Sequence, residues 1–256
     1  MTSCHSSEGL AQRIRGNVER IRERVEAACR RAGRHPSEVS LIAVTKTWGP
    51  EVVLAAREAG LRDFGENYAQ ELARKAEALR DAGIRWHFIG ALQTNKVKGI
   101  VSLLSSVHSV DRPSLVLELG RRIEAAAQRP ADRTSDGPRA LDVFVEVNLA
   151  RESQKSGVSP DGVLDLCRLI LDQPVLRLKG LMCVPPIAGD PEGSRRYFQE
   201  LRALRERVVR ELAPPPGVLS DLSMGMSHDF EVAIEEGATV IRIGTALFGA
   251  RPVQNG

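Results

Sequence analysis

The segment "VSLIAVTKTWGPEVVLAAREAG", residues 39–60, contains the unit from which the fold can be worked out. Its first part, residues 39–46, is a short and mostly apolar run of the kind that forms a buried strand. The part that follows starts with Pro50 and ends with Gly60, which are the residues expected at the start and just past the end of a helix. The segment therefore predicts a strand and then a helix.

The same strand-then-helix pattern recurs along the rest of the chain. We expect eight short strands, at residues 39–46, 61–66, 84–90, 103–110, 141–149, 175–182, 218–224 and 239–244. Strands that alternate with helical segments form parallel sheets with crossover helices. Eight such units favour a single closed (β/α)8 TIM-type barrel. An open doubly wound sheet is the alternative, but the chain has no GxGxxG or Walker sequence to favour it.

One further helix is expected before the barrel. Apolar residues spaced by three and four positions define one helical face, namely Ile14, Val18, Ile21, Val25 and Ala28. Residues 1–8 are polar and predict a flexible tail. We assign residues 9–251 to the barrel with its extra N-terminal helix, residues 252–256 to a second tail, and residues 128–140 to a polar surface insertion.

The composition limits the class of protein. The chain has 256 residues, with 36 basic and 33 acidic side chains, which is too balanced to indicate nucleic-acid binding. No apolar run is long enough to span a bilayer, and the N-terminus "MTSCHSSEGL" lacks the apolar region of a signal peptide. Cys4, Cys29, Cys167 and Cys183 include no CxxC pair and predict reduced, mostly buried thiols. We expect a cytoplasmic protein that binds neither nucleic acid nor membrane.

Lys46 closes the first predicted strand, and the active site of a (β/α)8 barrel lies at the carboxyl ends of its strands. Two interpretations remain open from its position alone. The side chain can run along apolar surface and place its ammonium in water. Alternatively, a neutral amine in a partly apolar pocket can attack an aldehyde and form a Schiff base.

The ends of the seventh and eighth strands favour the second interpretation. They carry the short turns "GMS" and "RIGT", each rich in glycine or small polar residues where a helix begins. Free backbone N–H groups at such turns suit a phosphate. A lysine and a phosphate site at one barrel mouth predict a ligand with both an aldehyde and a phosphate, and pyridoxal 5′-phosphate (PLP) has both groups.

Several long motifs carry a family resemblance: "AVTKT" (43–47), "FGENYAQE" (64–71), "WHFIGALQTNK" (86–96) and "LSMGMSHDFEVAIEEGATVIRIGTALFGAR" (222–251). They resemble the pyridoxal phosphate homeostasis protein family, whose members bind PLP and are related to the N-terminal barrel of alanine racemase. The resemblance runs from about residue 10 to residue 251. It implies a fold-type-III PLP barrel that holds PLP as a Schiff base and keeps it available, without established catalytic turnover.

The resemblance also implies roles for individual residues. Lys46 matches the lysine that forms the Schiff base, and Asn67 matches a residue beside the cofactor ring. The remaining matches are Ser227, Gly244 and Thr245 at the phosphate, Arg242 facing the pyridine nitrogen, and Met224 and Met226 at the pocket wall.

Arg242 bears on whether the protein is an enzyme. An arginine stays charged and disfavours a protonated pyridine nitrogen, which argues against transaminase or decarboxylase chemistry. A PLP-dependent amino-acid racemase remains the alternative, since the racemases that this chain resembles tolerate that arginine. A racemase needs a second acid/base group, in those enzymes a tyrosine of a separate domain. We expect no room for such a domain here, and neither Tyr68 nor Tyr197 is well placed.

We therefore expect a monomeric PLP carrier that interacts with PLP, with amino acids that displace it, and with apo PLP enzymes that receive it. A lysine-dependent lyase without PLP is a more distant alternative.

Other candidate sites are weaker. Ser227, His228 and Asp229 are consecutive in sequence, and adjacent side chains at a helix start diverge, so they do not predict a catalytic triad. His87 and His108 lie in strand-like runs and predict hydrogen-bonding core residues rather than metal ligands. Lys155, in "QKSG", lies either in a solvated loop or at a second site that receives or releases PLP.

Overall fold

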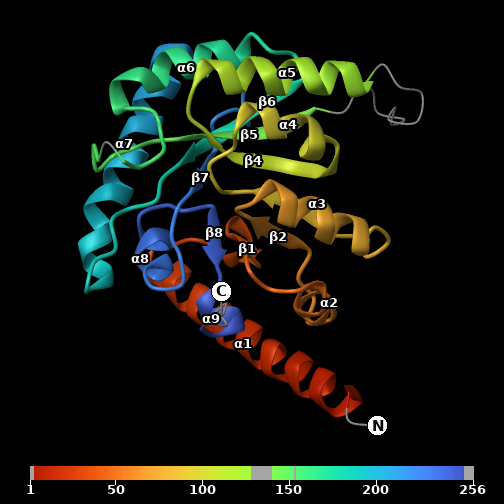
Figure 1. The fold of residues 1–256 in the computed structure, drawn as a ribbon. Helices are drawn as coiled ribbons and strands as arrows, with labels where there is room; N and C mark the ends of the chain where they lie inside the picture. Colours follow the sequence, from red (N-terminus) through yellow and green to blue (C-terminus); the bar gives the residue numbers. More distant parts are fainter. Residues whose placement is uncertain (1–2, 128–139, 153, 251–256) are drawn as a thin grey trace.

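The fold is a closed barrel of eight parallel strands surrounded by helices (Figure 1). It is seen in a computed structural model that describes residues 3–127, 140–152 and 154–250. The strands are β1 (Ser40–Val44), β2 (Asp63–Glu66), β3 (Arg85–Phe88), β4 (Leu104–Val110), β5 (Leu141–Glu146), β6 (Leu176–Met182), β7 (Asp221–Ser223) and β8 (Val240–Ile243). Each lies within one of the eight predicted ranges. The (β/α)8 barrel is confirmed, and the open doubly wound sheet is excluded.

The barrel closes where β8 pairs with β1. Ile42 lies beside Arg242, and Ala43 lies beside Ile243. Neighbours in register point to the same side of a sheet, while successive residues point to opposite sides. Ile42 packs with Phe144, Met182 and Val240 in a small cluster of its own, separate from the main hydrophobic core. We infer that Ile42 and Arg242 face the barrel interior, while Ala43 belongs to the core between sheet and helices.

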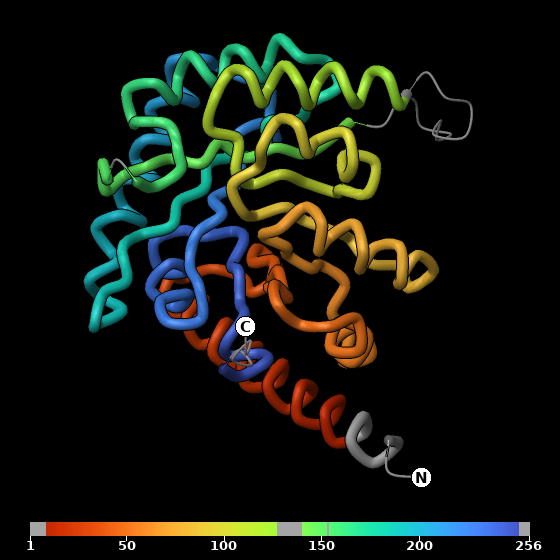
Figure 2. The backbone as a smooth tube through the Cα atoms, in the orientation of Figure 1, coloured from red at the N-terminus to blue at the C-terminus, as the bar shows by residue number. Residues whose placement is uncertain are grey.

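The helices follow the strands around the barrel, and the chain makes one circuit from β1 to β8 (Figure 2). The α-helices are α1 (Ser3–Arg31), α2 (Pro50–Glu58), α3 (Ala69–Ala78), α4 (Thr94–Ile100), α5 (Pro113–Ala127), α6 (Val163–Leu171), α7 (Arg195–Leu212), α8 (Phe230–Glu235) and α9 (Thr245–Phe248). Short 3-10 helices lie at Pro36–Glu38, Val101–Leu103, Pro160–Gly162 and Pro191–Ser194. Pro50 starts α2 and supplies the preset backbone angle of a first helical residue.

The extra helix α1 lies outside the barrel and packs against α2, α8 and α9 (Figure 1). The predicted apolar face is buried, with Ile14, Val18, Ile21, Val25 and Ala28 at most 8% exposed. Burial of each larger side chain contributes about 1.5–3 kcal/mol. The helix begins at Ser3. Its first turns thus fall within the range predicted as a tail, and the predicted domain bounds stay a prediction.

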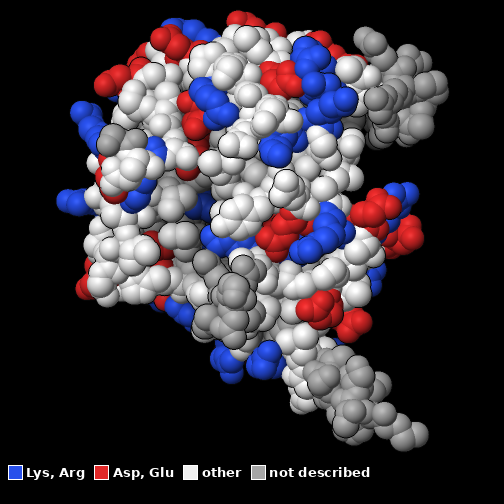
Figure 3. All heavy atoms as spheres, viewed as in Figure 1, with Lys and Arg blue, Asp and Glu red and all other residues white. Residues whose placement is uncertain are grey.

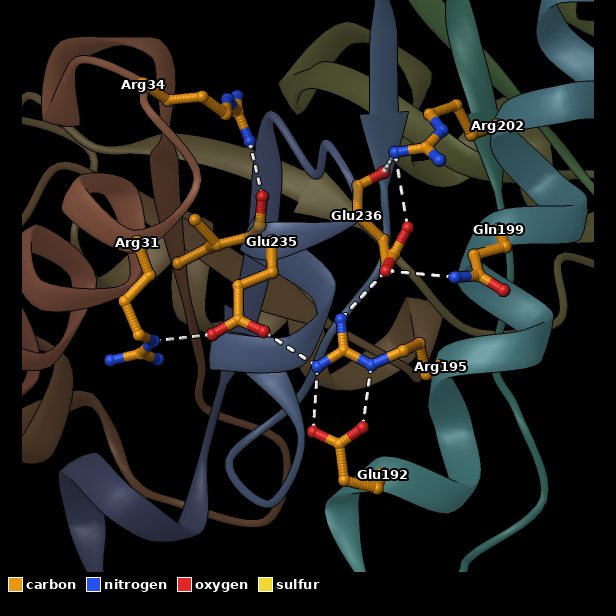
Figure 4. A network of polar contacts seen from close by, with 9 residues as sticks. Arg31, Arg34, Glu192, Arg195, Gln199, Arg202, Glu235 and Glu236 are labelled. Atoms are coloured by element: carbon orange, nitrogen blue, oxygen red, sulfur yellow. Dashed lines mark hydrogen bonds and ion pairs between the residues drawn. The ribbon is translucent and has the colours of Figure 1, made fainter.

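A polar network ties the end of α1 to α7 and α8 (Figure 4). Arg195, on α7, contacts the carboxylates of Glu192, Glu235 and Glu236 at 2.7–2.8 Å. Glu235 also accepts from Arg31 Nε of α1, at 2.7 Å. The network therefore clamps the N-terminal helix to the last units of the barrel, although its partly exposed ion pairs each contribute little stability.

The surface and the cysteines agree with the composition. Basic and acidic side chains are interspersed over the face seen in Figure 3. Among the described residues, no helix is both long and apolar enough to cross a membrane. Cys29, Cys167 and Cys183 are free and buried, as predicted, and burial raises the pKa of Cys167 to about 12. The predicted insertion, apart from residue 140, and the second tail lie outside the described residues.

Candidate functional site at the mouth of the barrel

Lys46 lies at the carboxyl end of β1, two residues after the strand ends at Val44. Side chains alternate along a strand, so Val44 faces the same side as the inward-facing Ile42, and Lys46 follows in the turn just beyond it. A small cavity at this end is lined by Val44, Lys46, Trp48, Gly244, Thr245 and Gly249. The structure thus brings Lys46 together with Gly244 and Thr245, two consecutive residues near the other end of the sequence.

The backbone around Lys46 is held by a buried network from α3. Lys75 Nζ donates to Thr45 O (2.6 Å), Glu66 Oε1 (2.6 Å) and Glu71 Oε1 (2.7 Å). Thr45 Oγ1 donates to Glu66 Oε1 at 2.7 Å, and the N–H of Thr47 donates to Glu71 Oε1 at 2.7 Å. Sequence reasoning missed this network, since a glutamate and a lysine four residues apart on a helix usually indicate an exposed ion pair.

The turns after β7 and β8 converge on one hydroxyl group. Ser227 Oγ accepts hydrogen bonds from the N–H groups of Gly244 and Ala246, both at 3.2 Å. The first turn needs a glycine at position 225, because its φ is +93° and a Cβ there would lie 2.6 Å from the Cβ of Ala233. The oxygen of Ser227 thus joins the two turns, and its hydroxyl proton can serve as a donor to an anion.

Arg242 is buried on β8 and anchored at two points. Its Nη1 donates to Ser223 Oγ (2.7 Å) and its Nη2 donates to Cys183 O (2.9 Å). Ser223 Oγ also contacts His108 Nδ1 at 2.8 Å, and His108 stacks on Phe144 with ring centroids 4.1 Å apart. Burial, with positive groups nearby, lowers the pKa of His108 well below its ordinary value. A neutral His108 can therefore accept the Ser223 proton, which leaves the serine oxygen to receive Arg242.

Glu146 is an acidic residue that sequence reasoning missed. It ends β5, is 9% exposed, and follows the inward-facing Phe144 by two residues. Burial, reinforced by Asp111 and opposed by Arg242, raises the pKa of its carboxyl to about 7. Residues 144–146, "FVE", carried the signal that could have identified it. Side chains alternate along a strand, so Glu146 faces the same side of the sheet as Phe144.

Asn67 and Met224 lie at the ends of β2 and β7. The amide oxygen Oδ1 of Asn67 is buried, and no described residue bonds to it. The loop after β3 approaches Asn67 closely at Gly90, where a Cβ would lie 2.4 Å from Asn67 O. Met224 is fully buried, while Met226 is half-buried. The unpartnered amide oxygen of Asn67 is unusual, because buried polar atoms are normally satisfied.

The histidine prediction is confirmed, and the rejected triad does not form. His87 bonds to Ser106 Oγ at 2.7 Å and to Asp63 Oδ1 at 2.9 Å. Ser227 Oγ bonds to backbone amides, as described above. Asp229 Oδ1 instead accepts from Met226 N at 2.8 Å, and His228 is exposed. The three consecutive side chains therefore have separate partners.

Lys155 lies in the loop between β5 and α6. Its Nζ pairs with Glu152 Oε1 at 2.8 Å, and its side chain is 34% exposed. Asn148 Nδ2 donates to Glu152 O at 2.8 Å, which ties the described part of this loop back to the end of β5. The loop is thus more closely attached to the barrel than a purely solvated loop would be, and a role for Lys155 toward PLP stays a prediction.

The fold and site define a class of protein, and comparison with known proteins identifies it. The family described as "Alanine racemase, N-terminal domain" matches residues 16–252. A crystal structure of alanine racemase from Corynebacterium glutamicum has a TM-score of 0.62, with 15% identity over 96% of this chain and 63% of that chain. At this identity the likeness shows the fold alone, so the chain has the alanine racemase type of barrel.

More similar relatives narrow the class. The pyridoxal phosphate homeostasis protein of Aquifex aeolicus is 44% identical over 91% of this chain and 96% of its own length. The protein of the same name from Pseudomonas aeruginosa is 42% identical, with coverage of 93% and 96%. PipY of Synechococcus elongatus, solved with PLP bound, has a TM-score of 0.73 and 32% identity, with coverage of 90% and 100%. The chain belongs to the pyridoxal phosphate homeostasis protein family.

Proposed function

We propose that this protein holds PLP at the barrel mouth as a Schiff base on Lys46, and that it buffers and delivers this cofactor. One observation carries the proposal: Lys46 shares a cavity with the Gly244–Thr245 turn, whose backbone meets Ser227. An amine and an anion-binding turn are thereby placed side by side. The names of the homologous proteins and the PLP bound to PipY support the same function.

The residues present fit PLP. Bound PLP supplies an aldehyde, with which a lysine amine forms a Schiff base and releases water. Gly244 lies close to the end of β1, since a Cβ there would lie 3.4 Å from Val44 O, in ordinary van der Waals contact. The buried Oδ1 of Asn67 lacks a partner among the described residues and would gain one from a polar group of a ligand.

Each proposed contact uses a group whose position the fold determines. Ser227, Gly244 and Thr245 would hold the phosphate through hydroxyl and backbone N–H groups. Arg242 would face the pyridine nitrogen, held in place by Ser223 and Cys183 O. Asn67 and Met224 would flank the ring, with Met226 at the pocket wall.

We propose a carrier rather than an enzyme with turnover. The curated relatives bear the name of a homeostasis protein. Among the described residues the side chain of Arg242 donates to Ser223 Oγ and Cys183 O, and an arginine rather than a carboxylate would face the pyridine nitrogen. Tyr197 lies on α7, where its hydroxyl accepts from Arg196, and Tyr68 is 58% exposed. We further propose that the protein is a monomer and that it exchanges PLP with amino acids and with apo PLP enzymes. The three buried free cysteines support a reducing compartment such as the cytoplasm.

The test compares the wild-type protein with Lys46→Ala. Wild type mixed with PLP should show the visible absorption band of PLP bound to an amine, and borohydride reduction followed by peptide mapping should place the label on Lys46. Lys46→Ala should lose both signals. Incubation of the loaded wild type with L-alanine should yield no D-alanine.

Two results would count against the proposal. Absence of the band with excess PLP would refute cofactor binding and favour a lysine-dependent lyase. Catalytic formation of D-alanine that depends on Lys46 would instead favour a racemase. Light scattering on a sizing column would test the monomer.

A further inference from the structure

Lys75 is a lysine with no exposed surface, and its three donors each have an acceptor. Such burial is rare for lysine, because the desolvation of an ammonium group offsets most of what its ion pairs contribute. Well-packed apolar side chains often stabilise a fold as much as a buried ion pair does. Stability alone therefore does not explain why a buried ion-pair network lies at this place in the fold. Its contacts with the backbone beside Lys46 give a second explanation.

The network contacts the backbone on both sides of Lys46. On one side Lys75 binds Thr45 O directly. On the other side the N–H of Thr47 donates to Glu71, and the same carboxylate oxygen accepts from Lys75. One ammonium group on α3 thereby connects the two peptide units that flank Lys46.

The turn that the network holds is strained. Thr47 has a φ of +69°, in the left-handed region that a β-branched residue rarely adopts. Such a conformation is unfavourable and persists only where surrounding contacts enforce it. The hydroxyl oxygen of Thr47 is also buried without a partner among the described residues. Strain and an unsatisfied group beside a proposed reactive lysine are typical of a positioned functional residue.

We propose that Lys75 is a positioning residue that fixes the backbone at Thr45 and Thr47 and thereby aims the amine of Lys46 into the barrel mouth. This inference rests on the proposed function of Lys46. Lys75 is not proposed to contact PLP itself. Lys75 acts through Thr45 and Glu71, and its effect is preorganisation: a lysine held in the binding geometry loses less conformational freedom when PLP binds.

The test replaces Lys75 by methionine, which preserves length but removes the charge and the donors. Two properties are measured. Hydrogen exchange at the Thr47 amide, followed by NMR in the protein without PLP, should accelerate about tenfold or more as its acceptor is released. The dissociation constant for PLP, from titration of the absorption band, should rise by about tenfold or more.

Arg195→Met is the matched control. Arg195 also binds three carboxylates, those of Glu192 in the 3-10 helix before α7, Glu235 at the end of α8 and Glu236 just after it (Figure 4). Glu235 and Glu236 precede β8, whereas Lys46 follows β1 at the other end of the barrel. This variant should lose thermal stability while it retains the wild-type exchange rate at Thr47 and the wild-type affinity for PLP. A purely structural role for Lys75 would make the two variants behave alike.

Glu71→Leu covers the case in which Lys75→Met does not fold. It removes the acceptor of the Thr47 amide, and Glu71→Gln, which keeps an acceptor oxygen, should restore slow exchange. A folded Lys75→Met with wild-type exchange and affinity would overturn the proposal, as would Glu71→Leu with wild-type exchange. Exchange at Thr47 is measured without PLP, so its outcome is separate from that of Lys46→Ala, which tests the proposed function itself.

Discussion

Replacement of Glu146 by glutamine should make the protein more stable at neutral and alkaline pH, by an amount that the structure allows us to work out. In the folded chain burial raises the pKa of this carboxyl from 4.5 to about 7. Between these values the folded state holds a proton that the unfolded state has released. The free energy of unfolding therefore falls as pH rises from about 4.5 to 7, by about 1.4 kcal/mol per pH unit, and levels off above that range. Glutamine cannot ionise and avoids this loss, which amounts to about 3 kcal/mol.

The assay is urea unfolding of wild type and Glu146→Gln at several pH values between 4.5 and 8.5. The two proteins should differ little at pH 4.5, and the advantage of the variant should grow to about 3 kcal/mol near pH 8. Comparison at each pH cancels the contributions of all other titrating groups. Glu206→Gln, at an exposed position of α7, controls for the substitution itself. Parallel stability curves for wild type and Glu146→Gln would show that the carboxyl is not buried in the manner described.

Two further substitutions test the turns at the barrel mouth. Ser227→Ala removes the acceptor of the Gly244 and Ala246 amides. We expect affinity for PLP to fall about tenfold, as for loss of one or two hydrogen bonds of about 1 kcal/mol each, with a small change in melting temperature; an unchanged titration would remove Ser227 from the site. Gly225→Ala adds a Cβ at a φ of +93° and 2.6 Å from the Cβ of Ala233. It should lower the free energy of unfolding by more than about 1 kcal/mol, and a wild-type urea midpoint would contradict the described turn.

The fold was predictable because strand-like segments, among them the apolar runs of residues 40–44 and 141–146, alternate with helical segments along the chain. Lys46 was predictable for a related reason: a charged residue that ends such a run must lie at a barrel end. The motifs around Asn67, Ser227 and Arg242 were matched through resemblance, and the structure adds the hydrogen bonds of Ser227 and Arg242. These features depend on short segments whose direction follows from the alternation of side chains.

Lys75 and the hydrogen-bond chain of Arg242 could not be predicted in the same way. A Glu71–Lys75 pair has the spacing of a surface ion pair, and only the packing of α3 against β2 and β3 turns it inward. Ser223, His108 and Arg242 come from three strands, and their contact depends on barrel closure. Side chains that meet through tertiary packing leave no mark in the spacing of a single segment.

The pairing of β1 with β8 also has a consequence for how the protein is made. Lys46 follows the first strand, whereas Arg242 and the Gly244 turn belong to the last, so synthesis separates the two halves of the proposed PLP site by almost the whole chain. While β8 is still inside the ribosome, the edge of β1 that pairs with β8 has no partner strand. Contacts between such distant segments form late and slowly. The proposed PLP site therefore forms only when β8 closes the barrel against β1, and partly synthesised chains should not bind PLP.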